Sequence, residues 1–213
     1  MLGTHGVIYL IGIQPLTSVN HNLIHDIGGD GSGTGNGSGI VLDNSAVGIV
    51  VENNLIYNIA GDCLLFNFND IGNIIQNNIL AMPGRSVMNR SGDAGRLDQT
   101  GVFYRNIFYY DSRKAKLFHA DKWANFDVVM DFNLYYDVSG KPVSFLGMSQ
   151  EEWQKHKYWA KLRPKMDSIT ADPMFVDPAK GDYRLKPDSP AFKLGFQPLD
   201  LEDVGTRAVG RRE

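Results

Sequence analysis

Cysteine is nearly absent from this sequence. The 213 residues include a single one, Cys63, so a framework of intrachain disulfides is excluded. It begins the apolar segment Cys63-Leu64-Leu65-Phe66, where a cysteine usually behaves as a small buried hydrophobic residue. Its neighbours include no group that would activate the thiol, so we expect no catalytic role for it. The cysteine content does not indicate the cellular compartment of the protein.

Long apolar runs and an excess of basic charge are also missing. No segment approaches the roughly 18 apolar residues that a membrane-spanning helix requires. The chain carries 21 Lys and Arg against 24 Asp and Glu, a net charge of −3, whereas proteins that bind the phosphate backbone are usually basic. The sequence therefore predicts neither a membrane nor a nucleic acid as a partner.

The N-terminus lacks the pattern of a secretory signal peptide. Residues 1–6 carry no charged region that leads into a cleavable apolar stretch. Residues 6–12 already have the composition of a β-strand. We therefore expect the sequence to start within the fold, with N-terminal coils missing.

A short repeat is present instead. An Asn followed by two apolar residues recurs at intervals of 32, 24, 28 and 27 residues. Between these positions, apolar and polar residues alternate with a period of two, separated by turn residues. Units of this length hold two or three strands and leave no room for a crossover helix. The repeated residues are Asn22, Asn54, Asn78, Asn106 and Asn133.

This repeat predicts an all-β fold, a right-handed single-stranded parallel β-helix of about five to six coils with a C-terminal cap and one short helix. Each unit is one coil, stacked about 4.8 Å above the last. The repeated asparagines are predicted to form a ladder in which side-chain amides hydrogen-bond from coil to coil. The predicted boundaries are coils over residues 1–140, a helical excursion over 141–166 and a capping segment over 167–213.

Three insertions interrupt the repeat, and in a solenoid insertions usually lie on one face, often the binding face. Residues 28–39 hold seven glycines in twelve residues and predict a surface loop, because neither a Lys nor a helical pattern follows as in a phosphate-binding loop. Residues 83–98 are polar and charged. Residues 149–152, Ser-Gln-Glu-Glu, are typical of a capping box that begins a short helix.

Several stretches together resemble a known family. They are residues 12–15, 22–27, 39–43, 48–54, 77–79, 171–178, 181–185 and 189–191. They are similar to parallel β-helix proteins of carbohydrate metabolism, especially those like glycoside hydrolase family 141, which includes fucosidases and xylanases. The resemblance covers nearly the whole chain and corresponds to the C-terminal portion of a typical member. It implies a polysaccharide or oligosaccharide ligand, a bacterial source and an extracellular or periplasmic location.

The sequence departs from the family's pattern at three places. Thr4 and Asn44 stand where family members commonly carry acidic residues, while Asp43 keeps one of the expected carboxylates. Residues 66–69, Phe-Asn-Phe-Asn, stand where members tend to have a His-rich strand. These departures keep a non-catalytic relative open as an alternative.

Counting back from each repeated Asn places the candidate catalytic residues in columns. Asp43 and Asn67 lie eleven residues before a repeated Asn, and Asp70 and Asp98 lie eight residues before one. Alternation within residues 39–43 points Asp43 outward. Glycoside hydrolysis uses two carboxyl groups, about 5 to 5.5 Å apart for retention and about 6.5 to 9.5 Å for inversion. Asp43, Asp70 and Asp98 are therefore the candidate catalytic residues.

Substrate binding is assigned to polar residues of the matching stretches and of the second insertion. The candidates are His25, Asp26, Asn67, Asn69, Arg90 and Arg96. The two arginines would suit a uronate or sulfate group. No His and Cys cluster has zinc spacing, and no cofactor is predicted, with calcium held by C-terminal Asp residues as an alternative.

Three functions stay open at this point. The first is a carbohydrate-active β-helix of glycoside hydrolase type. The second is a non-catalytic glycan-binding or structural β-helix fragment, and the third is a polysaccharide lyase, which would need a basic residue beside a calcium-binding carboxylate cluster. We also expect a homo-oligomer, because an uncapped first coil presents unpaired backbone groups to a second copy, with C2 symmetry as the simplest arrangement.

Overall fold

The structure is a computed structural model. It describes residues 5–28, 37–68, 71–91, 100–119, 123, 127–155, 167–201 and 204.

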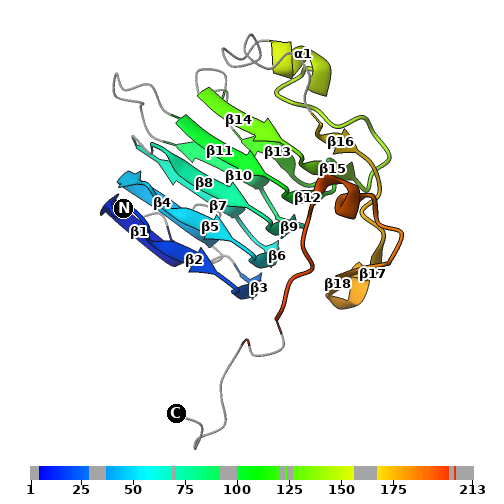
Figure 1. The fold of residues 1–213 in the computed structure, drawn as a ribbon, viewed down its shortest axis with the longest axis horizontal. Helices are drawn as coiled ribbons and strands as arrows, with labels where there is room; N and C mark the ends of the chain where they lie inside the picture. The colour runs from blue at the N-terminus through cyan, green and yellow to red at the C-terminus, as the bar shows by residue number, and fades with distance from the viewer. Residues whose placement is uncertain are drawn as a thin grey trace, which may run out of the picture.

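Three parallel sheets build the body of the molecule (Figure 1). Sheet A contains β1 (Gly6–Ile13), β4 (Ser38–Val47), β7 (Asp62–Asn67), β10 (Ser86–Ser91) and β13 (Lys116–His119). Sheet B contains β2 (Ser18–Asn20), β5 (Val50–Glu52), β8 (Asn73–Gln76), β11 (Thr100–Tyr104) and β14 (Asp127–Asp131). Sheet C contains β3 (Leu23–Ile27), β6 (Leu55–Ile59), β9 (Ile79–Ala81), β12 (Ile107–Tyr110), β15 (Leu134–Asp137) and β16 (Ile169–Thr170).

The chain visits the three sheets in the order A, B, C and then begins the next coil, so each strand pairs in parallel with the strand one coil away. The predicted parallel β-helix is confirmed. It makes about four turns, slightly fewer than the predicted five to six coils. The repeat offset of 24 residues is also confirmed, because Ile40 pairs with Leu64 and Leu42 with Phe66.

The interior of the coils forms the main core. Ile40, Leu42, Leu64 and Phe66 are all buried in it. Residues between them point to the other face of sheet A, because side chains alternate along a strand. Cys63 is fully buried in the same core, which confirms its prediction as a small buried hydrophobic residue.

The predicted asparagine ladder runs through the stack where sheet B turns into sheet C. The Asn54 side-chain oxygen accepts from the backbone N–H of Asn22 at 3.0 Å and from its side-chain amide at 2.9 Å. Asn78 Oδ1 accepts the same two bonds from Asn54, at 3.0 and 2.9 Å. The pattern repeats through Asn106 and Asn133. It ends at Ser168, whose hydroxyl accepts from the Asn133 N–H at 3.0 Å.

A left-handed residue precedes each ladder asparagine. Asn53 and Asn77 have φ values of 55° and 51°, a conformation that Asn tolerates better than most residues. The equivalent positions in the later coils are Arg105 and Phe132, with φ of 54° and 55°. The corner therefore keeps one backbone shape although its residue changes, and the ladder bonds that follow fix this shape.

The short helix α1 (Gln150–Lys155) begins with the predicted capping box. The Ser149 hydroxyl accepts from the Glu152 N–H at 3.2 Å, and the Glu152 carboxylate accepts from the Ser149 N–H at 2.8 Å. This helix buries Trp153 against Phe118 of β13, with ring centroids 5.3 Å apart. Phe145 packs on Phe118 as well, at 5.9 Å. These aromatic rings cover the last strand of sheet A.

The C-terminal segment lies beside sheet C. The antiparallel strands β17 (Phe175–Asp177) and β18 (Asp182–Leu185) and the 3-10 helices η3 (Pro178–Lys180) and η4 (Pro190–Leu194) belong to it. Its apolar residues form a second cluster with the residues that sheet C points away from the main core. Figure 1 shows this segment alongside β9 and β12. The sequence predicted a cap over the last coil, whereas this part of the segment covers a lateral face.

Candidate functional site

The candidate site is the outward face of sheet A, where Asp43 lies. Residues of adjacent strands form rows across this face at the strand spacing of about 4.8 Å. One row contains Asp43 of β4, Asn67 of β7 and Ser91 of β10, with Ile11 of β1 beside Asp43. The next row contains Tyr9, Val41, Leu65, Asn89 and His119. The register confirms that Asp43 shares a column with Asn67 and points away from the main core, although both residues are buried.

Three donors hold the Asp43 carboxylate, which is only 3% exposed. The Tyr9 hydroxyl donates to Oδ2. The Asn67 side-chain amide donates to Oδ1 at 2.8 Å, and the backbone N–H of Asn44 donates to the same oxygen at 2.7 Å. The Ser91 hydroxyl donates to Asn67 Oδ1 at 2.7 Å and extends the chain of polar contacts to a third strand. The result is a continuous polar stripe along the axis of the stack.

A second carboxylate of sheet A, Asp62, is too far along the strand to act with Asp43. Because Leu64 pairs with Ile40, Asp62 lies level with Ser38, five residues from Asp43. At about 3.3 Å per residue this separation is roughly 16 Å, beyond the range of about 5 to 9.5 Å that glycoside hydrolysis needs. Asp62 is therefore not the partner carboxylate.

Asp62 is instead the centre of a buried polar cluster. It is fully buried and accepts from Arg85 Nε at 2.9 Å, from the Ser86 hydroxyl and from the Asn89 side-chain amide at 2.8 Å. The hydrogen bond to Asp62 raises the pKa of Arg85. Asn89 Oδ1, also buried, accepts no hydrogen bond from the part of the chain that the structure describes. It is a spare acceptor in the same row as Tyr9.

Arg90 does not lie on this outward face. It pairs in register with Phe66, which belongs to the main core, and it is 4% exposed. Alternation along β10 therefore turns Arg90 inward while Asn89 and Ser91 face outward. The placement differs from the predicted substrate contact, because the insertion pattern could not show that β10 continues up to Ser91.

His25 and Asp26 belong to sheet C and do not converge with Asp43. His25 Nδ1 lies 2.7 Å from Asp26 Oδ2, and the His25 ring stacks on Tyr57 with centroids 5.0 Å apart. Hydrogen bonds from His25 and from Asn58 lower the pKa of Asp26. This pair forms a separate polar corner at the end of β3.

Four predicted site residues lie outside the described residues. They are Asp70, Asp98, Asn69 and Arg96. The distance from Asp43 to either predicted carboxylate partner stays a prediction.

Sequence reasoning missed Tyr9, Asn89 and Ser91. Their signal was the repeat itself, because Ser91 follows Asn67 at the offset of 24 residues that relates Asn67 to Asp43. Tyr9 was missed because it lies level with Val41 and only its long side chain reaches Asp43, which a count of columns does not show.

Metal-binding clusters and membrane-spanning helices are both absent from the described residues. No group of three or more His, Cys, Asp or Glu side chains could hold a metal ion within these ranges. None of the described helices has the length and hydropathy to cross a membrane. The calcium alternative stays untested.

Comparison with protein-family models, with curated proteins and with solved structures gives no match in any of the three. The resemblance to glycoside hydrolase family 141 thus rests on the sequence stretches alone. The parallel β-helix itself rests on the register of the three sheets.

Proposed function

We propose that this protein is a carbohydrate-binding β-helix whose binding face is the outward face of sheet A. The observation that carries the proposal is the polar stripe of Asp43, Asn67 and Ser91 on three adjacent strands. Sugar hydroxyls pair with carboxylates, amides and hydroxyls of this kind. The partly exposed ring of Tyr9 beside the stripe supplies an amphipathic aromatic surface for the apolar face of a sugar ring.

A ligand would enter the stripe at Tyr9. The Tyr9 hydroxyl occupies Asp43 Oδ2, so a sugar hydroxyl that binds this oxygen replaces the tyrosine as its donor. Asn67 and Asn44 keep Oδ1 in place during the exchange.

For catalysis, we propose that Asp43 acts with Asp70 in glycoside hydrolysis. Asp70 follows Asn67 by three residues, and Asn67 is one strand spacing from Asp43. In an inverting reaction one carboxylic acid protonates the leaving oxygen while the other carboxylate activates a water molecule. Asp62 is excluded by distance, and Asp70 and Asp98 stay the partners that the sequence predicts.

Binding and hydrolysis are tested together on a panel of plant, algal and bacterial polysaccharides and aryl-glycosides. The variants are Asp43→Asn and Asp70→Asn, with Asp188→Asn, an exposed carboxylate of the C-terminal segment, as the control. Asparagine at position 43 keeps the acceptor for Asn67 and can donate to the Tyr9 oxygen, so its melting temperature should stay near that of the parent.

The expected result is loss of glycan binding in Asp43→Asn and unchanged binding in Asp188→Asn. If the face also hydrolyses its ligand, Asp70→Asn should retain binding and lose turnover. Absence of binding across the whole panel would contradict the binding face. Turnover that survives in Asp43→Asn would contradict its catalytic role and leave binding to be judged separately.

A further inference from the structure

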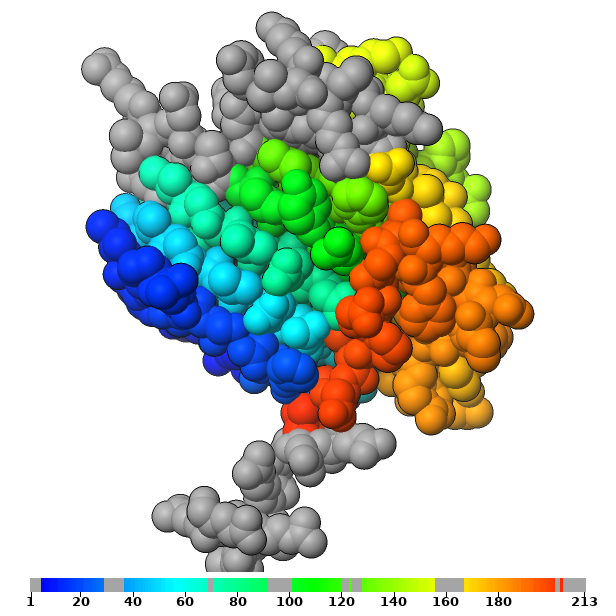
Figure 2. All heavy atoms as spheres, in the orientation of Figure 1, coloured from blue at the N-terminus to red at the C-terminus, as the bar shows by residue number. Residues whose placement is uncertain are grey.

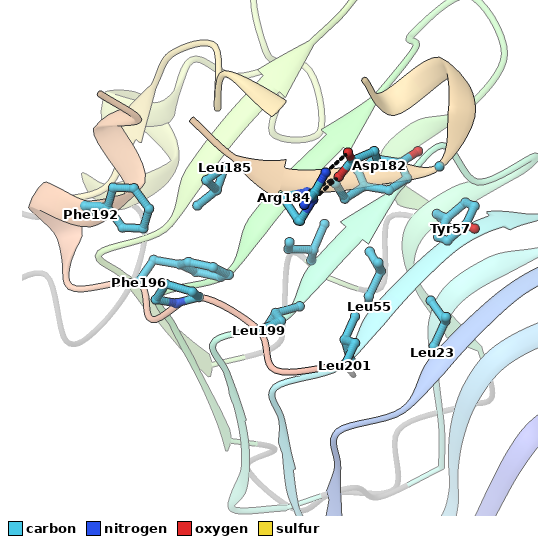
Figure 3. Close-up of a pocket in the computed structure, with 14 residues that line it drawn as sticks. Leu23, Leu55, Tyr57, Asp182, Arg184, Leu185, Phe192, Phe196, Leu199 and Leu201 are labelled. Carbon is cyan, nitrogen blue, oxygen red and sulfur yellow. Dashed lines mark hydrogen bonds and ion pairs between the residues drawn. The ribbon is translucent and has the colours of Figure 1, made fainter. Parts of the chain in front are cut away.

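A cleft of about 440 Å³ lies between sheet C and the C-terminal segment, away from the polar stripe. One wall is Leu23, Leu55 and Ile79, a single row on three successive strands. The facing wall comes from residues after η3 and includes Phe196 and Leu199. Figure 3 shows the labelled leucine and phenylalanine side chains of both walls directed toward one space.

The cleft exists because the C-terminal segment covers only part of an apolar face. The row that begins with Leu23, Leu55 and Ile79 continues through Ile107 and Leu134, both buried beneath that segment. Toward the first coil the cover separates from the sheet, and Leu23 is only half-buried.

The charged groups of the lining neutralise each other. They are Asp182 and Arg184, joined by two hydrogen bonds of 2.8 and 2.6 Å from the guanidinium to the carboxylate. Tyr57 and Tyr183 also contribute to the lining, with ring centroids 4.9 Å apart. Burial raises the pKa of both phenols, so they are neutral at physiological pH. An anion or cation in the cleft would find no unpaired partner among the described lining residues.

We propose that this cleft binds an uncharged apolar molecule of the size of two fused or linked aromatic rings. Apolar walls exclude water and gain free energy from each buried carbon. A dry cavity of about 150 Å³ lined by similar residues accepts one benzene ring, so a cleft of 440 Å³ has room for a two-ring ligand. This site is independent of the proposed glycan-binding face.

The probe for this site is 6-propionyl-2-dimethylaminonaphthalene, an uncharged molecule of two fused aromatic rings whose fluorescence shifts to shorter wavelength when it leaves water. Leu55→Trp fills the cleft from its sheet wall. Val176→Trp is the control, because Val176 is exposed on β17 of the same segment and does not line the cleft. The parent and Val176→Trp should bind the probe saturably at one site, and Leu55→Trp should bind it at least about tenfold more weakly.

Leu23→Trp is the second filling variant if Leu55→Trp fails to fold, since Leu23 is only half-buried. Equal binding to the parent and to a folded filling variant would overturn the proposal, as would the absence of saturable binding to the parent. Tighter binding by a chain that ends at Val204 than by the full chain would also overturn it, because the residues after Val204 would then be the occupant.

Discussion

The first and last strands of sheet A both direct apolar residues toward the main core, but they lie in different environments. On β1, Ile8 and Leu10 pack against the main core and are only partly buried, and the outward-facing Val7, Ile11 and Ile13 are 50%, 53% and 75% exposed. On β13, Leu117 and Phe118 are each 2% exposed. Figure 2 shows the first strands, in dark blue, at the surface along one edge of the molecule. The comparison shows that a coil buries its apolar residues fully only when a neighbouring coil or a covering segment packs on each side of it.

The aromatic cover at the β13 end is the largest difference between the two ends. Trp153→Ala should destabilise the protein by about 3 to 5 kcal/mol, because it removes a fully packed ring from beside Phe118. Leu16→Ala, at a residue that is 92% exposed near β1, should change the free energy of unfolding by less than about 0.5 kcal/mol. Urea unfolding of both variants measures the two effects, and equal losses would show that the ends do not differ.

The ladder provides the second contrast. Asn78→Ala leaves the backbone and side-chain donors of Asn54 without their acceptor, so it should cost about 1 to 3 kcal/mol. Asn22→Ala at the exposed end removes a residue that donates to Asn54, and we expect about 1 kcal/mol or less. Thermal melts within error of the parent for Asn78→Ala would refute the structural role of the ladder.

A measurement of self-association tests whether a second copy of the protein covers the exposed edge of sheet A at β1 in solution. The sequence predicted a homo-oligomer through the first coil, and β1 carries no charged residue that would discourage edge pairing. Ile13→Lys should therefore lower the average mass in light scattering toward that of the monomer. Ile74→Lys, at an exposed position on β8, is the matched control. A parent chain that is monomeric across a wide concentration range would contradict the prediction.

The smallest expected effect is the acid response of a corner beside the later coils. A hydrogen-bonded ion pair with Arg113 lowers the pKa of Asp111 from 3.8 to about 2. The folded-state pKa is depressed, so its contribution to stability is present above pH 3.8 and is lost as the pH falls toward 2. Asp111→Asn should melt at a lower temperature than the parent above pH 3.8. This difference in melting temperature should shrink as the pH falls toward 2, because the parent then loses the charge on Asp111. A gap independent of pH would exclude this linkage.

Local repetition made the coils and the ladder predictable from sequence. The offset of 24 residues predicts that Ile40 lies beside Leu64, and the spacing from Ser149 to Glu152 predicts the start of α1. These features depend on contacts between equivalent positions, which a repeat displays directly.

The lateral cover of sheet C was not predicted, although the sequence held a sign of it. Sheet C strands carry two adjacent apolar residues, such as Leu55-Ile56 and Ile79-Leu80, which indicates burial on both faces. That pattern indicates that another part of the chain covers the outer face of sheet C, but it does not identify the covering segment. The Asp62 cluster was missed for a different reason: Ser86 lies at the repeat offset of 24 residues from Asp62, but Arg85 and Asn89 lie 23 and 27 residues from it and fall outside that column.

The most direct test of this account is native-state hydrogen exchange read out strand by strand in dilute solution. The account predicts strong protection for amides of β7, β8 and β9, which have a coil on each side. It predicts weak protection for β1, β2 and β3, which lie at the edges of their sheets. Protection of β1 to β3 equal to that of the central strands, in a protein shown to be monomeric, would contradict the claim that neighbouring coils create the stability of each coil.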